Sequence, residues 1–233
     1  SEILDHEVAL GSTSQQMKTR TQTIHRNAKI LLGLVNDLLD LSRIEAGGLD
    51  VKKQDVCLRE ILEETATSLM PTAVKKGLRL NYKTADDIPD TIFTDPLRLK
   101  QIIINLVDNA IKFSDKGQID IVTLLENSSS LVIYVNDQGV GISQEHLGKL
   151  FKAFSQVEES YKNKSSGTGL GLYLIKRLIH AMGGKIELVE SQPGKGSSFK
   201  ITLTHCVQKT GVKNFYSQIF TRKPSTEPFS LHQ

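Results

Sequence analysis

The chain has 233 residues, of which 39% are hydrophobic, an ordinary content for a soluble globular protein of one large or two modest domains. Its 29 basic and 26 acidic residues give a net charge of +3 and are scattered in both signs, which argues against a nucleic-acid or membrane-surface partner. Cys57 and Cys206 form neither a disulfide framework nor a metal site, so a reducing, cytoplasmic setting is expected. No apolar run approaches the roughly 20 residues that span a bilayer, and no signal peptide opens the chain.

The N-terminal part is predicted to be helical in two pieces. Residues 1–10 form a short amphipathic piece, which the Gly-Ser-Thr-Ser run at 11–14 is expected to end. A longer helix then extends to the glycine pair at 47–48, which supplies a C-terminal stop. Its apolar spacing is typical of a helical hairpin or bundle, and packing on its own domain is the simpler alternative. The stripe consists of Met17, Ile24, Ala28, Leu31, Val35 and Leu38, widened by Leu32, Leu34, Leu39, Leu41 and Ile44.

A predicted helix at residues 96–114, started by Pro96, carries polar side chains that could bind a metal ion or a phosphate. Asn105 and Asn109 are four residues apart, so they share one stripe of the helix, and Lys112 lies one turn further on. Amide oxygens can coordinate Mg²⁺, and an ammonium can bind phosphate. Two asparagines on a polar helix face can also have no such role. Upstream, strands are predicted at 51–58, 78–84 and 92–95, and a helix at 58–76 that Pro71 kinks or interrupts.

Two alternating strands at 117–125 and 130–136 lead to the run Asp-Gln-Gly-Val-Gly-Ile at 137–142. Asp137 can accept a hydrogen bond from the exocyclic amine of a nucleotide base. Gly139 and Gly141 lack a Cβ, which lets the main chain approach a planar ring closely. Taken alone, the run is first of all a tight turn after a strand.

The C-terminal half contains a second glycine run, Gly-Thr-Gly-Leu-Gly at 167–171, which is expected to open a helix at 169–182. Unpaired amides and the helix dipole at such an N-terminus favour phosphate oxygens. Before it, a helix is predicted at 146–151, with Leu147, Leu150 and Phe154 stacked against the domain, and a polar loop at 155–166. After it, strands at 185–189 and 198–203 surround a structural turn at 192–196, and the pattern then weakens.

The order and spacing of these motifs carry a family resemblance. Residues 97–203 resemble the ATP-binding catalytic domain of sensor histidine kinases, within the ATPase group shared with gyrase and the Hsp90 chaperone. The Phe-Lys-Ala-Phe run at 151–154 resembles the phenylalanine box between the two glycine boxes. The Asp-Leu-Ser-Arg-Ile-Glu-Ala-Gly run at 40–47 resembles the end of the second dimerisation helix. The resemblance implies an α+β fold, a two-layer sandwich with a mixed, mostly antiparallel sheet, preceded by a long dimerisation helix.

The resemblance also implies a set of functional residues. Asn109 would coordinate Mg²⁺, Asn105 would support the metal and phosphate geometry, and Lys112 would reach a phosphate of ATP. Phe113 stands beside the nucleotide, where a tyrosine is more usual, and residues 155–166 resemble the flexible ATP lid. The remaining residues expected at ATP are Asp137, Gly139, Gly141, Ile142, Phe154, Gly167, Thr168, Gly169, Leu170, Gly171 and Leu172.

The resemblance divides the chain into three parts. Residues 1–47 would be a partial dimerisation and phosphotransfer hairpin, 51–206 the ATP-binding domain, and 207–233 a C-terminal linker. The family's acceptor motif, a His-Glu pair followed closely by Pro, is absent: His6 has no following Pro and His25 lies in the second helix.

The implied activity is histidine phosphorylation from Mg-ATP for relay to a response regulator, with pairing of two copies through the long helix. A hybrid kinase, with a receiver domain after the linker, is one form this family takes. Membrane attachment would come only through segments outside this chain. The alternative from another class is a noncatalytic nucleotide-sensing or scaffold module.

Overall fold

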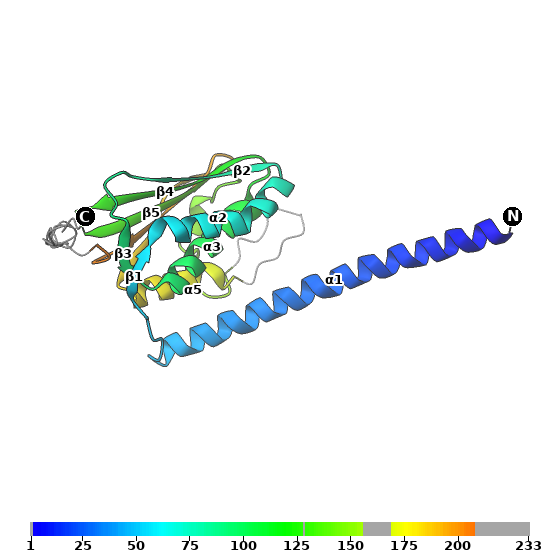
Figure 1. Ribbon diagram of the computed structural model, residues 1–233, viewed down its shortest axis with the longest axis horizontal. Coiled ribbons are helices and arrows are strands. Elements are labelled where there is room, and N and C mark those ends of the chain that lie inside the picture. The colour runs from blue at the N-terminus through cyan, green and yellow to red at the C-terminus, as the bar shows by residue number, and fades with distance from the viewer. Residues whose placement is uncertain (1, 128, 156–168, 208–233) are drawn as a thin grey trace, which may run out of the picture.

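The computed structural model of the chain describes residues 2–127, 129–155 and 169–207. A long helix, α1 (Glu2–Glu45), leads into a domain in which helices cover one face of a five-stranded sheet, and its N-terminal part projects away from that domain (Figure 1). The other helices are α2 (Leu58–Lys75), α3 (Pro96–Phe113), α4 (Gln144–Leu147) and α5 (Gly171–Ala181). The strands are β1 (Gln54–Cys57), β2 (Leu78–Thr84), β3 (Thr91–Thr94), β4 (Gly117–Glu126), β5 (Ser130–Asp137), β6 (Gly184–Gln192) and β7 (Gly196–Leu203).

The main sheet has the strand order β2-β4-β5-β7-β6. Only β2 and β4 run parallel, and the remaining neighbours are antiparallel, which confirms the predicted mixed, mostly antiparallel sheet. A separate antiparallel pair, β1 and β3, sits beside it. The two-layer α+β fold expected from the sequence is therefore present.

Burial alternates along the strands because one sheet face packs against the helices and the other faces solvent. In β7, for example, Phe199, Ile201 and Leu203 are buried while Ser198, Lys200 and Thr202 are partly exposed. The core continues into α3 and α5 at helical spacing. The buried residues of α3 are Leu99, Ile102, Ile103, Leu106, Val107, Ala110 and Ile111, and those of α5 are Leu174, Ile175, Leu178 and Ile179.

The predicted helix stop at residues 11–14 is wrong. The helical backbone of α1 is continuous from Glu2 to Glu45 and includes Gly11. A single glycine costs only about 1 kcal/mol relative to alanine inside a helix, which the turns on either side can offset. In the described part of the chain, no helix combines the length and apolarity needed to cross a membrane.

The C-terminal turns of α1 are fixed to the domain by a buried polar cluster. Asp40 accepts hydrogen bonds from Arg98 (3.1 Å) and Gln101 (3.0 Å), and Arg98 also donates to Gln101 (2.9 Å). The side chains of Arg98 and Asp40 are only 13% and 14% exposed. The cluster therefore joins the end of α1 to the first turns of α3.

Two boundaries differ from the sequence expectation around the second glycine run. The helix predicted at 146–151 is a single turn, α4, and the helix predicted from residue 169 begins at Gly171. The expected packing of Leu147 and Phe154 is also wrong, because their side chains are 41% and 68% exposed. Leu150, between them, does pack against the core.

Candidate nucleotide-binding site

Helix α3 presents the predicted metal and phosphate ligands along one partly exposed stripe. Asp95 caps its N-terminus by accepting a hydrogen bond from the Arg98 amide (3.0 Å), and Pro96 occupies the first turn, as the sequence predicts. Asn105 and Asn109 are both half-buried beside the buried face of the helix. Within the described residues neither amide side chain has a hydrogen-bond partner, so both remain able to bind a ligand.

Lys112 and Phe113 complete the last turn of α3. The Lys112 ammonium lies 5.0 Å from the centroid of the Phe113 ring, within the range of a cation–π interaction. Burial lowers the pKa of Lys112, and the neighbouring Asp108 carboxylate opposes that shift. Phe113 is 46% exposed, so its ring is accessible for contact with a flat ligand. The turn thus offers a cation and an aromatic face together.

Asp137 is the last residue of β5, where the sequence places it. Its Oδ1 accepts a hydrogen bond from the Gly139 amide (2.8 Å), which fixes the orientation of the carboxylate. Burial raises the pKa of Asp137, while backbone hydrogen bonds from Gly139 and Ser197 act in the opposite direction. A half-buried carboxylate in a fixed orientation is suited to accept a hydrogen bond from a buried donor.

The Asp137 turn is attached directly to the end of α3. The Val140 amide donates to the Phe113 carbonyl (3.1 Å), so two segments far apart in sequence meet at this point. A Cβ at Gly139 would clash with that same carbonyl oxygen. The sequence argument assigned the missing Cβ to clearance for a ligand ring, but the structure gives a different reason. The glycine is needed because the protein's own backbone occupies the space.

The turn that follows Asp137 is also held by the hairpin between β6 and β7. Gly194 donates its amide to the Val140 carbonyl (2.8 Å), and Ser191 Oγ accepts from the Ile142 amide (2.8 Å). Gly141 has a φ of +68°, and a Cβ there would clash with the Gln192 carbonyl. The sequence analysis treated this hairpin as purely structural and missed Ser191. The run at 192–196 has the composition of an ordinary turn, and no local pattern signals its contact with residues 139–142.

The second glycine segment is described from Gly169 onward, and the predicted residues Gly167 and Thr168 and most of the predicted lid lie outside the described residues. Leu170 is buried and precedes the first residue of α5, and Leu172 packs partly against the core, so any ligand contact at these residues would involve backbone atoms. Gly169 has a φ of +70°, and a Cβ there would lie 2.9 Å from the Phe154 carbonyl carbon. The structure therefore brings the backbones of these two predicted residues together, with the Phe154 ring exposed.

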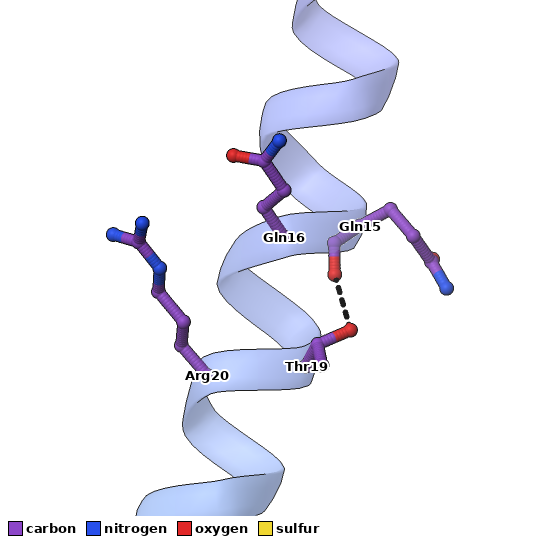
Figure 2. Close-up of a pocket in the computed structure, with 4 residues that line it drawn as sticks. All are labelled: Gln15, Gln16, Thr19 and Arg20. Carbon is purple, nitrogen blue, oxygen red and sulfur yellow. Dashed lines mark hydrogen bonds between the residues drawn. The ribbon is translucent and has the colours of Figure 1, made fainter.

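A surface hollow of about 430 Å³ lies elsewhere, on the projecting part of α1 (Figure 2). It is lined by side chains from consecutive turns of this one helix, namely Gln15, Gln16, Thr19 and Arg20. The Thr19 hydroxyl donates a hydrogen bond to the Gln15 carbonyl (2.9 Å). None of the predicted ligand residues lines it. The hollow is therefore separate from the site on α3 and β5.

Residues 94–205 match the family described as histidine kinase-, DNA gyrase B- and HSP90-like ATPase. The matched range contains α3, the Asp137 turn and the second glycine segment, so it covers every part of the site described above.

Curated proteins with sequences similar to this chain include sensor kinases. The sensor histidine kinase GacS of Pseudomonas protegens is 46% identical over 185 residues, covering 78% of this chain and 20% of GacS. The signal transduction histidine-protein kinase BarA of Escherichia coli is 42% identical over 181 residues, covering 76% of this chain and 20% of BarA. The chain thus spans about a fifth of the length of the curated relatives it matches.

A solved structure supports the same conclusion. Full-length ShkA in complex with AMPPNP superposes with a TM-score of 0.69 at 29% identity, over 76% of this chain and 36% of ShkA. Fold, motif positions and sequence similarity agree: residues 94–205 form a domain of the histidine kinase-, DNA gyrase B- and HSP90-like ATPase family, and the curated proteins similar to this chain include sensor histidine kinases.

Proposed function

We propose that this chain is the ATP-binding core of a two-component histidine kinase and transfers the γ-phosphoryl group of Mg-ATP to a histidine on a helical hairpin. A response regulator aspartate would receive the phosphoryl group next. The observation that carries the proposal is the hydrogen bond between Val140 and Phe113, since it places the Asp137 carboxylate beside the turn that holds Asn109 and Lys112. Base and phosphate ligands thereby lie on adjoining elements. The binding of AMPPNP by ShkA is consistent with this assignment.

Each group has a distinct task in the proposed reaction. The Asp137 carboxylate accepts a hydrogen bond from the adenine amine, and the Phe113 ring lies against the nucleotide. Lys112 and the amides at the start of α5 hold phosphate oxygens. Once these groups hold the nucleotide, phosphoryl transfer depends mainly on positioning and electrostatic stabilisation. Asn105 cannot act as a general base, so activation of water and rapid ATP hydrolysis are not expected.

The site has ligands that fit Mg²⁺ bound together with a nucleotide. Among the described residues, no group of three or more His, Cys, Asp or Glu side chains is placed to hold a metal by itself. Mg²⁺ keeps several waters and commonly takes its remaining ligands from substrate phosphates and one or two protein oxygens. Asn109, supported by Asn105, offers amide oxygens for this purpose. The ion would neutralise charge on the phosphate oxygens.

We further propose that α1 pairs with α1 of a second copy. Four side chains spaced by seven residues form an apolar stripe that the described part of the chain leaves 45% to 69% exposed: Met17, Ile24, Leu31 and Leu38. Sedimentation analysis should give a dimer for the wild type and a monomer for Leu31→Glu. A monomeric wild type at tens of micromolar would refute the pairing.

The direct test of the kinase proposal is transfer of radiolabel from γ-labelled ATP to a separately supplied acceptor hairpin. The hairpin must be supplied because the chain lacks the family's acceptor motif. Transfer that disappears in Asp137→Asn would support a competent kinase core. Tight binding of Mg-ATP without any transfer would favour the noncatalytic sensing or scaffold function instead.

A further inference from the structure

The C-terminal end of α3 is closed by groups from other elements. The last four carbonyls of a helix have no partner within the helix, and many helices satisfy some of them with a following glycine in the left-handed conformation. Here the residue after the helix is Ser114, in an extended conformation with φ of −107° and ψ of 133°. It provides no such cap, so the carbonyls need donors from elsewhere.

Lys76, the residue that follows α2, provides donors to two of these four carbonyls and to the Ser114 carbonyl just beyond the helix. Its ammonium donates to the carbonyls of Ile111 (2.8 Å), Lys112 (2.9 Å) and Ser114 (3.3 Å). All three donors of one ammonium are therefore directed at a single helix terminus, where the helix dipole also favours a cation. A third of the four, the Phe113 carbonyl, accepts a hydrogen bond from the Val140 amide (3.1 Å).

This closure lies at the residues that the proposed function requires. Lys112 and Phe113 belong to the same turn, and the Asp137 turn is attached through Phe113. A shift of the turn would therefore move the phosphate-binding ammonium and the base-binding carboxylate relative to each other.

We propose that Lys76 is a positioning residue for ATP binding: by holding the carbonyls at the end of α3, its ammonium fixes Lys112 in the geometry that receives the phosphates. This inference rests on the proposed nucleotide site. Lys76 itself need not touch the nucleotide, since it acts through the backbone of α3. The inference gives a role to a residue 36 positions away in sequence from Lys112 and outside the matched family range.

The test compares Lys76→Met with Lys75→Met. Methionine keeps the apolar stem of lysine and removes the ammonium. Lys75 is the adjacent lysine, and within the described part of the chain its exposed side chain makes no hydrogen bond or ion pair. Affinities for Mg-AMPPNP and for adenosine would be measured by calorimetry, and circular dichroism at the same temperature would check that each variant is folded.

We expect Lys76→Met to weaken Mg-AMPPNP binding about tenfold, as for the loss of one or two charge-assisted hydrogen bonds, and adenosine binding less than threefold. Lys75→Met should match the wild type, and Lys76→Arg should recover most of the affinity because guanidinium can donate to the same carbonyls. If Lys76→Met is unfolded, Lys76→Gln decides the test. Glutamine keeps a shorter neutral donor, so the Mg-AMPPNP affinity of this variant should lie between the wild-type affinity and the affinity expected for Lys76→Met.

Three results would overturn the inference. The first is an unchanged Mg-AMPPNP affinity in Lys76→Met, or in Lys76→Gln if the methionine variant is unfolded. The others are equal losses of affinity for Mg-AMPPNP and adenosine, and equal losses of affinity in the variants at positions 75 and 76. Equal losses for the two ligands would indicate a general structural role. A wild type that binds no nucleotide would refute the proposed function itself, and that outcome is separate from any difference between variants.

Discussion

Replacing Asp137 with asparagine changes the hydrogen-bonding capacity of the proposed adenine site at one atom. Asparagine keeps an oxygen that can accept the Gly139 amide, as Oδ1 does now at 2.8 Å. Its second atom becomes an NH₂ group, which would face the adenine amine as donor against donor. The loss of a hydrogen bond to a charged acceptor, with a donor left unpaired, is expected to cost about 3 kcal/mol of binding free energy, or roughly a hundredfold in Kd.

The same substitution should leave the nucleotide-free fold intact. Burial raises the folded-state pKa of Asp137 above the ordinary carboxyl value of 3.8. A raised carboxyl pKa means that the folded state binds the proton more tightly, so this group stabilises the fold below about pH 3.8 and loses that contribution as the pH rises through the folded pKa. At pH 7 the ionised carboxylate is therefore a net cost, and its neutral replacement should change the free energy of unfolding by less than about 1 kcal/mol.

Calorimetric titration with Mg-AMPPNP and thermal unfolding without nucleotide would check both parts. Asp90→Asn is the matched control, because Asp90 is exposed in the loop between β2 and β3. That loop follows Thr84, which pairs with Thr123, whereas Asp137 pairs with Ile119 near the other end of β4. Asp137→Asn binding within threefold of wild type would refute the reasoning, as would a large loss of stability without nucleotide.

Three further substitutions test the rest of the site. Asn109→Ala should lower Mg-dependent phosphotransfer at least tenfold more than it lowers adenosine affinity, and equal losses in the two assays would count against its metal role. Arg98→Met should destabilise the domain by about 2 kcal/mol in urea unfolding because the mostly buried Asp40 carboxylate keeps only the neutral donor Gln101, and the added change Asp40→Leu should restore much of that loss; a double variant no more stable than Arg98→Met would contradict this. Gly139→Ala should weaken nucleotide binding about tenfold because its Cβ meets the carbonyl at the end of α3, whereas Gly148→Ala, where a Cβ has nothing within 4 Å, should be neutral in binding assays.

The amino-acid sequence was sufficient to predict the helix that carries the site. Asp95 and Pro96 mark its start, and apolar residues at helical spacing define its buried face, so Asn105 and Asn109 are assigned to its partly exposed side. Asp137 at the end of β5 was predicted equally well, because a short apolar run of strand length, residues 131–135, leads to it. These features depend on neighbours only a few residues apart in the chain.

The helix stop at Gly11 and the packing of Phe154 were predicted wrongly. Glycine after an amphipathic segment often ends a helix, but its local preference is worth about 1 kcal/mol, and the surrounding turns outweigh it in α1. The phenylalanine box suggested a stacked ring at residue 154, yet its backbone φ of +58° accompanies a side chain that is 68% exposed. Both errors come from weak local signals.

Local sequence patterns predicted the secondary structure around the site, the identity of its polar groups and the family that residues 94–205 match. Only the tertiary structure decided how these groups are held together. The Val140 bond to Phe113, the Ser191 bond to Ile142 and the three bonds from Lys76 join residues 27 to 49 positions apart in sequence. Each of these contacts has a backbone group on at least one side, and every residue carries such groups, so local sequence patterns do not signal the partner. The contacts form only when the packing of helices on the sheet brings the chain segments together.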